Sequence, residues 1–230
     1  MNVVNLGRVI IRRRTTGQHH GRLRDALEEA ALALVAEGGP HGFTLAGACR
    51  RAGVSVAAPY KHFADRDALL ASLAARSFAE QRRRCAAALA ASEDPREQLA
   101  AVAAAYVRFA GEERALFEIA FNAGLDKTRH PGLAAAAHEL IGVLMPVASR
   151  AAGEEAAFDL LVRVASAAHG LALFLQHGSL GGHREPLSVT EDRAARTARA
   201  LVDQQRRQGP PPAHPSEDYM LSDQTKDPAR

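Results

Sequence analysis

The chain of 230 residues is 47% hydrophobic but only 5% aromatic, and its many Ala and Leu residues favour helices over strands. Its net charge of +3 is unevenly placed: residues 1–84 hold 14 Lys and Arg against 7 Asp and Glu, whereas residues 85–230 hold 15 against 19. This asymmetry is consistent with a nucleic-acid-binding module at the N-terminal end and equally with a solvated basic surface. Two distant cysteines and no apolar run of about 18 residues free of charges or breaks argue against a disulfide framework, a metal motif or a membrane span, so a cytoplasmic protein is expected.

The N-terminal segment, residues 1–20, is predicted to be a disordered basic arm. Its charges follow its short apolar stretch, which is the wrong order for a secretory signal. The arginines at 12–14 could enter a minor groove of DNA or lie on its phosphates, and a solvated tail is the alternative. A first helix is then predicted over Arg22–Glu37, where apolar residues recur at helical spacing until a Gly-Gly-Pro sequence ends it.

Residues 43–70 predict two short helices joined by a tight turn, the layout of a helix-turn-helix. Thr44 can cap a short helix that ends at Gly53, a residue suited to the positive φ of a sharp reversal. Ser55 can cap a second short helix to about His62, and Asp65 can cap a long helix to about residue 91. The second short helix is expected to be the one that enters a major groove.

The rest of the chain predicts a bundle of longer helices. These are expected at about residues 95–110, Glu112–Asn122, Gly132–Arg150, Glu154–His177 and Val189–Arg207. We therefore expect an all-α fold of about nine helices, with an N-terminal three-helix bundle carrying the helix-turn-helix at 21–75 and a C-terminal helical bundle at 76–208. Residues 209–230 are rich in Pro, Ser and Asp and are predicted to be a disordered tail.

The predicted helix-turn-helix resembles the TetR/AcrR family of bacterial transcriptional regulators. The resemblance covers about residues 22–75 and is carried by Ala-Gly-Val-Ser at 52–55, Tyr-Lys-His-Phe at 60–63 and Asp-Arg-Asp at 65–67, in register. It implies phosphate contacts by Thr44 and Ser55, for which plain helix capping is the alternative. It also implies that Tyr60 and His62 contact the DNA backbone, unless Tyr60 only packs against the first helix.

The sequence departs from this family where the DNA bases would be contacted. Ala57 and Ala58 stand where the family often has Gly and Thr or Ser, and Pro59 replaces an aliphatic residue and removes an N–H. Arg66 replaces the usual Lys and keeps a positive charge for phosphate. The expected DNA-binding residues are Thr44, Ser55, Val56, Ala57, Ala58, Tyr60, Lys61, His62 and Arg66. The face expected to meet the bases is formed by Val56, Ala57, Ala58 and Lys61 and has few hydrogen-bonding groups. Thymine methyl groups, phosphates and DNA shape are therefore expected to carry much of the recognition, with Lys61 as the best candidate for a guanine contact.

The family resemblance implies that the rear helices bind a small-molecule effector and form a homodimer. The candidate effector-binding residues are Tyr106, Phe109, Phe117, Phe121, His138, Met145, His169 and Phe174. Ordinary core packing is the alternative for each aromatic residue and for the two histidines. His169-Gly170 also resembles part of a Trp-His-Gly motif found in one subfamily, although the Trp is absent. The last two long helices are expected to pair with their copies, so that a two-fold dimer matches a pseudo-palindromic operator.

The resulting hypothesis is a ligand-responsive transcriptional regulator, most simply a repressor that a small molecule releases from double-stranded DNA. One alternative is a DNA-binding protein without a ligand response. Another is a helical enzyme using His138, His169 or Glu139, but the sequence has no Gly-rich phosphate loop, nucleophile elbow or HExxH motif. We therefore expect no catalytic residues, no metal site and no cofactor.

Overall fold

The computed structural model of the chain describes residues 16–178 and 185–208, and these residues form helices and turns without strands. Eight α-helices and two short 3₁₀ turns follow one another along the described chain. They are α1 (Thr16–Gly42), α2 (Leu45–Ala52), η1 (Pro59–Lys61), α3 (Arg66–Leu89), α4 (Pro95–Glu112), α5 (Arg114–Asn122), η2 (Lys127–Arg129), α6 (Pro131–Ala152), α7 (Glu154–His177) and α8 (Leu187–Gln208). The all-α prediction is confirmed.

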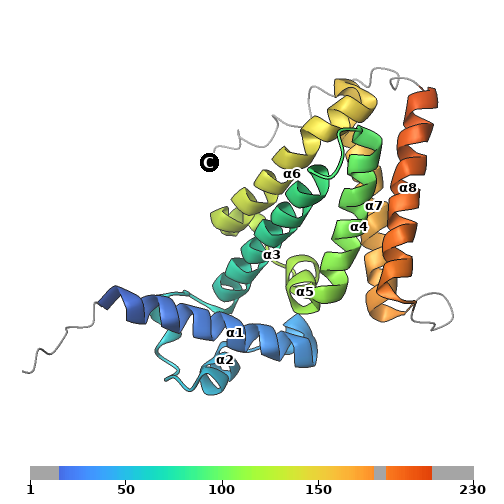
Figure 1. The fold of residues 1–230 in the computed structure, drawn as a ribbon. Coiled ribbons are helices and arrows are strands. Elements are labelled where there is room, and N and C mark those ends of the chain that lie inside the picture. Colours follow the sequence, from blue (N-terminus) through green and yellow to red (C-terminus); the bar gives the residue numbers. More distant parts are fainter. Residues whose placement is uncertain (1–15, 179–184, 209–230) are drawn as a thin grey trace, which may run out of the picture.

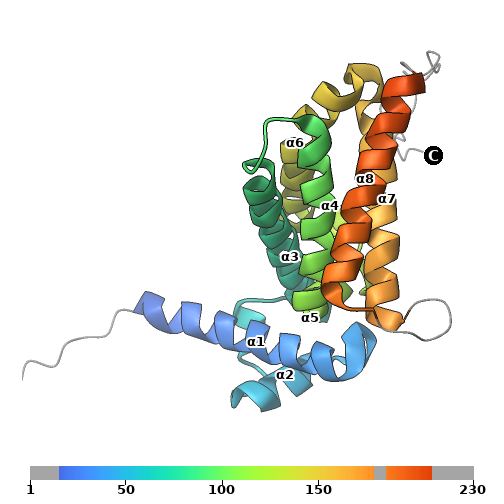
Figure 2. The same ribbon diagram turned by 45° about the vertical axis from the view of Figure 1, so that its right-hand side comes forward.

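The helices form two parts that share α3. Helices α3, α4, α6, α7 and α8 stand side by side, whereas α1 lies across one end of this bundle with α2 beyond it (Figures 1 and 2). The short helix α5 fills the junction and packs against both α1 and α3. The N-terminal part is therefore joined to the bundle chiefly through α3 and α5.

The N-terminal part differs from the predicted boundaries at both ends of its first helix. α1 already begins at Thr16, so the prediction of disorder is wrong for residues 16–20; residues 1–15 lie outside the described part. Gly39 does interrupt the helix, with φ 72° and ψ 170°, but helical geometry resumes at Pro40 and continues to Gly42. Proline is favoured in the first turn of a helix because its missing N–H has no partner there, so the Gly-Pro pair restarts the helix instead of ending it.

A continuous apolar core extends from the N-terminal part into the bundle. Phe43 and Phe63 are buried beside Leu70 of α3, and the same cluster continues to Phe117 of α5 and Leu144 of α6. A second cluster lies between α4, α7 and α8, around Leu99, Leu160 and Val202. Since α3 contributes to both ends of the first cluster, a displacement of this helix in the bundle must also move the N-terminal part.

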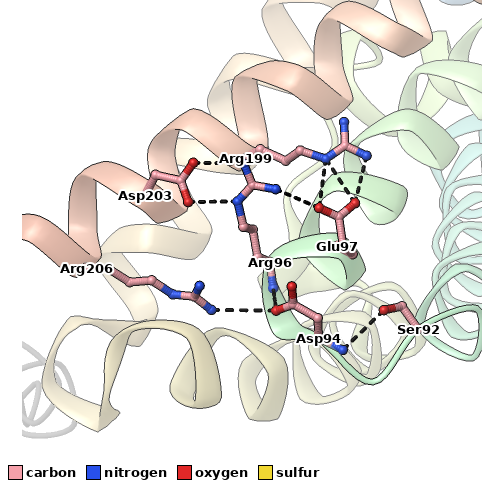
Figure 3. Close-up of polar contacts among 7 residues, drawn as sticks. All are labelled: Ser92, Asp94, Arg96, Glu97, Arg199, Asp203 and Arg206. Atoms are coloured by element: carbon pink, nitrogen blue, oxygen red, sulfur yellow. Dashed lines mark hydrogen bonds and ion pairs between the residues drawn. The ribbon is translucent and has the colours of Figure 1, made fainter.

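A cluster of charged residues fastens α4 to α8 at the end of the bundle away from α1 (Figure 3). The Arg96 guanidinium donates from Nε and Nη2 to both carboxylate oxygens of Asp203, at 2.7 and 2.8 Å. Arg199 donates in the same manner to Glu97, at 2.8–3.0 Å, and Arg96 also contacts Glu97 at 2.7 Å. These bidentate pairs fix the register of the two helices.

Two of the helices, α6 and α7, are also long and apolar enough to cross a membrane by length and composition alone. Both pack in the bundle, against each other and against α4. Core helices of a water-soluble bundle show the same composition, so the expectation of no membrane span stays a prediction.

Candidate functional site

The first helix of the helix-turn-helix is capped at both ends as predicted. Thr44 Oγ1 accepts a hydrogen bond from the Gly47 N–H at 3.0 Å. At the other end Gly53 adopts φ 67° and ψ 30°, and the Val54 N–H donates to the Cys49 carbonyl at 3.0 Å. This pairing is the Schellman arrangement, which reverses the chain within two residues. Thr44 therefore serves as an N-cap while remaining exposed.

The second helix of the motif is not an α-helix. Between Ser55 and Phe63 the regular structure is reduced to the 3₁₀ turn η1, Pro59–Lys61. An α-helix would need an N–H at position 59 to bond the Ser55 carbonyl, and Pro59 has none; the Ala58 N–H takes this carbonyl instead, at 3.0 Å. The prediction of a helix from Ser55 to His62 is wrong for this reason, although Ala58 keeps helical φ and ψ of −62° and −41° despite preceding proline.

This short turn nevertheless projects from the surface of the N-terminal part. Pro59 is buried and anchors it, whereas Val56 and Tyr60 are 62% and 64% exposed. The exposure of Tyr60 contradicts the alternative that its ring packs against the first helix. Ser55, Ala57 and Lys61 are also exposed, and Ala58 is half-buried. The segment therefore presents methyl groups, one phenol and one ammonium to an approaching partner.

Two of the nine expected DNA-contacting residues, Arg66 and His62, make contacts within the protein. The Arg66 guanidinium bonds the backbone carbonyls of Phe43, at 3.1 Å, and Pro40, and it lies over the Phe43 ring. It therefore closes the end of α1 onto the start of α3 instead of projecting beside Tyr60. His62 is half-buried next to the Phe63 ring.

Sequence reasoning missed one basic residue at this surface. Arg50 lies in the last turn of α2 and is exposed, and it forms no ion pair with any residue that the structure describes. Its neighbour Arg51 is bound to Glu37 at 2.7 Å. The pairing of Arg51 could not be read from the sequence, because Glu37 lies on another helix.

The bundle contains a cavity of about 390 Å³ between α3, α4, α5, α6 and α7. Three of the predicted effector-binding residues, Tyr106, Phe121 and His169, line it. Phe117 lies directly behind them, fully buried, and its ring stacks on the His169 ring with centroids 5.4 Å apart. Its volume lies within the range of small-molecule pockets in proteins.

Two of these rings hydrogen-bond each other and are uncharged. Tyr106 Oη lies 2.8 Å from His169 Nδ1. Burial lowers the pKa of His169 and raises the pKa of Tyr106, so both groups are neutral near pH 7. The tautomer of His169 decides which of the two groups donates this bond.

The other four predicted residues do not line the cavity. Phe109 is fully buried in the core and stacks with Arg84, and Met145 packs half-buried against the same core. His138 is exposed on α6, and Phe174 is exposed on α7. Helical spacing alone does not tell which face of α4, α6 or α7 meets the cavity, and none of these four residues is in its lining.

The α3 wall of the cavity was missed entirely, because the sequence-based prediction considered only aromatic residues, Met and histidines of the rear helices. Phe78, Gln81 and Cys85 line it from α3. Burial raises the pKa of the Cys85 thiol to about 11. Their spacing of three and four residues places them on one face of the helix that starts at the N-terminal part.

Several large apolar residues are exposed on the last two helices. Phe158, Val162 and Phe174 of α7 and Val189 of α8 are each 40–59% exposed. Among the described residues no group of His, Cys, Asp and Glu is placed to hold a metal ion.

Two family models match the chain. One describes bacterial regulatory proteins of the tetR family and matches residues 27–73; the other describes a tetracyclin repressor-like C-terminal domain and matches residues 99–203. These ranges contain the helix-turn-helix and most of the cavity. Among curated proteins no relative was found.

Solved structures share the fold over most of their length. A protein of unknown function from Rhodococcus sp. RHA1 is 27% identical, with a TM-score of 0.65 and coverage of 86% of this chain and 100% of its own. A TetR family transcription regulator from Marinobacter aquaeolei VT8 is 19% identical, with a TM-score of 0.61 and coverage of 81% and 98%. The TetR family transcriptional regulator PfmR from Thermus thermophilus is 20% identical, with a TM-score of 0.57 and coverage of 81% and 99%. The matched families are regulators and not enzymes.

Proposed function

Because the chain belongs to the TetR family of bacterial regulatory proteins and is therefore a DNA-binding transcription regulator, we propose that it acts as a cytoplasmic, dimeric repressor. It binds a pseudo-palindromic operator through two copies of the Thr44–Lys61 segment and leaves the DNA when a small molecule enters the cavity. The observation that carries this proposal is the exposed segment around Tyr60, which leads within a few residues into α3, the helix that forms one wall of the cavity.

Charge and exposure support the DNA-binding surface. Arg50 and Lys61 are exposed cations that form no ion pair with any described residue, so both remain available to phosphates or base edges. Val56 and Ala57 offer only methyl groups, which suit thymine methyls in a major groove. Arg66 contributes by holding the base of the segment, not by contacting DNA.

Fluorescence anisotropy over a range of salt concentrations tests the DNA-binding proposal, with the DNA upstream of the gene for this protein as the probe. If Lys61 binds a base, Lys61→Ala is expected to reduce the preference of the protein for one DNA sequence over others. Arg50→Ala is expected to weaken binding to all sequences, and the slope of log K against log salt concentration should become smaller in magnitude by about one. Arg129→Ala removes an equal charge from an exposed turn of the bundle and serves as the matched control. Equal losses at Lys61 for every sequence would contradict base recognition, and no loss at either residue would contradict this surface.

The exposed apolar residues on α7 and α8 support the homodimer. Phe158 and Phe174 lie on α7 at 59% and 49% exposure, and Val189 opens α8 at 40%. Pairing of these helices with their copies would cover these side chains. It would also place the two copies of the Thr44–Lys61 segment, which we call the reading segments, on one side of the assembly.

Sedimentation equilibrium tests the dimer. We expect a mass twice the chain's 24.5 kDa, and Phe158→Glu is expected to yield monomers that bind a full operator more weakly. Val56→Glu, which adds the same charge at the reading segment, should leave the dimer intact. A wild-type monomer that binds a single half-site would overturn this part of the proposal.

Ligand coupling is supported by the position of α3. Leu69 and Leu73 of this helix lie in the N-terminal core, and Gln81 and Cys85 line the cavity two to three turns later. A ligand that prefers a different placement of α3 would change the spacing of the two reading segments and so release DNA.

A cavity-filling variant tests the coupling. Ala168→Leu occupies space in the cavity and is expected to abolish any ligand-induced release of DNA while binding to DNA persists. Ala104→Leu, on the opposite side of α4 in a groove outside the cavity, is the matched control. If no compound in a broad panel changes DNA binding, the protein is a DNA-binding protein without a ligand response.

A further inference from the structure

The cavity wall is almost free of polar groups and carries no charged side chain. Its sixteen lining residues are apolar except for Gln81, Cys85, Tyr106, Ser166 and His169. The Gln81 amide does not ionise. The raised pKa of the Cys85 thiol and the lowered pKa of His169 keep those groups neutral as well. Nearby charges are already paired: Arg82 of α3 contacts Glu139 of α6 at 3.4 Å, outside the cavity lining.

One buried polar atom at this wall lacks a partner. Gln81 is 2% exposed, and its Nε2 donates to Ser77 Oγ at 3.3 Å. Its Oε1 has no hydrogen-bond partner among the described residues. A buried amide oxygen without a partner is costly, and it lies on a residue that faces an empty space large enough for a ligand. The oxygen has almost no accessible surface in the empty cavity. Rotation of the Gln81 amide toward an occupant that donates one hydrogen bond would remove this cost.

We propose that the cavity binds an uncharged, mainly apolar molecule that carries one neutral hydrogen-bond donor, such as an alcohol, and that Gln81 Oε1 accepts this bond. The inference rests on the proposed ligand-binding role of the cavity and specifies its chemistry. The apolar part of the ligand packs between the rings of Tyr106 and Phe121 and the aliphatic side chains of α6 and α7.

The same wall discriminates against charged molecules. A carboxylate or an ammonium would lose its hydration in this cavity and would find no opposite charge there. Tyr106 and His169 supply no such charge, because both are neutral near pH 7 and they already hydrogen-bond each other at 2.8 Å. Selection therefore works mainly by exclusion of charge, with the Gln81 hydrogen bond adding a preference among neutral molecules.

Three probes of equal chain length separate these effects: 1-octanol, octanoate and octylammonium, titrated calorimetrically into the full-length protein at pH 7.4. Octanol is expected to bind at least about tenfold more tightly than either ion. Gln81→Met keeps the side-chain volume and removes the acceptor, and it is expected to weaken octanol binding about fivefold to tenfold, the contribution of one hydrogen bond. Gln176→Met is the matched control, since Gln176 is also buried with an unpaired Oε1 but lies outside this cavity.

Each outcome bears on the inference. Equal binding of octanoate or octylammonium, no binding of octanol, or an unchanged octanol affinity in Gln81→Met would overturn it, and the comparison of the three probes on the unmodified protein does not depend on any variant folding. The proposed function is tested separately by anisotropy of the DNA complex in the presence of octanol. Binding of octanol that leaves DNA binding unchanged would contradict release by this ligand while the chemistry of the cavity stands.

Discussion

Gly53 offers a direct test of the turn that positions the reading segment. Its φ of 67° is in the left-handed region, and a Cβ built on it would meet no atom within 4 Å. Alanine at this position therefore suffers from backbone strain and not from collision. The strain is about 1–2 kcal/mol, and it is partly offset by about 0.4–1 kcal/mol because alanine restricts the unfolded chain.

We expect Gly53→Ala to lower the free energy of unfolding by about 1 kcal/mol, which corresponds to a loss of about 2–4 °C in Tm for a chain of this size. Gly53→Asn should lose less, because asparagine tolerates the left-handed region better. Gly142 provides a control position at which the same substitution should raise the free energy of unfolding. It is exposed within α6, has no positive φ, and has equal space for a Cβ, so Gly142→Ala should gain about 0.5–1 kcal/mol.

Circular dichroism at 222 nm during thermal unfolding measures all of these variants, and the chain has no Trp for a fluorescence assay. The protein concentration must be held constant because the stability of a dimer depends on it. If Gly53→Ala were as stable as the unmodified protein, the argument that this turn requires a left-handed residue would be wrong.

Contacts elsewhere in the chain give three further predictions. Asp65→Ala removes the side-chain cap of α3, a 2.7 Å bond, and should cost about 1 kcal/mol in chemical denaturation. The pKa values of Glu97 and Asp203 are lowered from 4.5 and 3.8, first by their hydrogen bonds with Arg199 and Arg96. Their contribution to stability is therefore fully present above these ordinary pKa values and is lost as the pH falls below them. In an acid titration, the Tm of Glu97→Gln should fall less steeply than the Tm of the unmodified protein. Burial raises the pKa of both thiols, that of Cys85 to about 11, so thiol reagents at pH 8 should modify native Cys49 and Cys85 far more slowly than the unfolded chain, and equal rates would contradict their burial.

Capping residues and helical periodicity predicted most of the helices correctly. The cap residues Thr44 and Asp65 both form the expected bonds, and Glu154–His177 is α7 to the residue. Helical periodicity and capping depend on neighbours within four positions, which a sequence displays directly.

The errors arose where the outcome depends on distant contacts or on one special residue. The positive charge of Arg66 is visible in the sequence, but the direction of its side chain is decided by two carbonyls more than twenty positions earlier, one in the last turn of α1 and one just after that helix. Pro59 reduced a predicted helix to one turn. Gln81 showed no sequence signal, because its importance comes from an unpaired oxygen at a cavity wall that five helices build together.

The ion pairs between α4 and α8 bear on which helices could move when the cavity is occupied. Arg96 and Glu97 are joined to Asp203 and Arg199 by bidentate contacts, so α8 is fastened to a helix that forms part of the cavity wall (Figure 3). A dimer joined through α7 and α8 would then act as a stationary frame. Any rearrangement caused by an occupant would then be expressed at the opposite end, where α3 and α5 connect the bundle to the N-terminal part, and a tilt of α3 there would displace Tyr60.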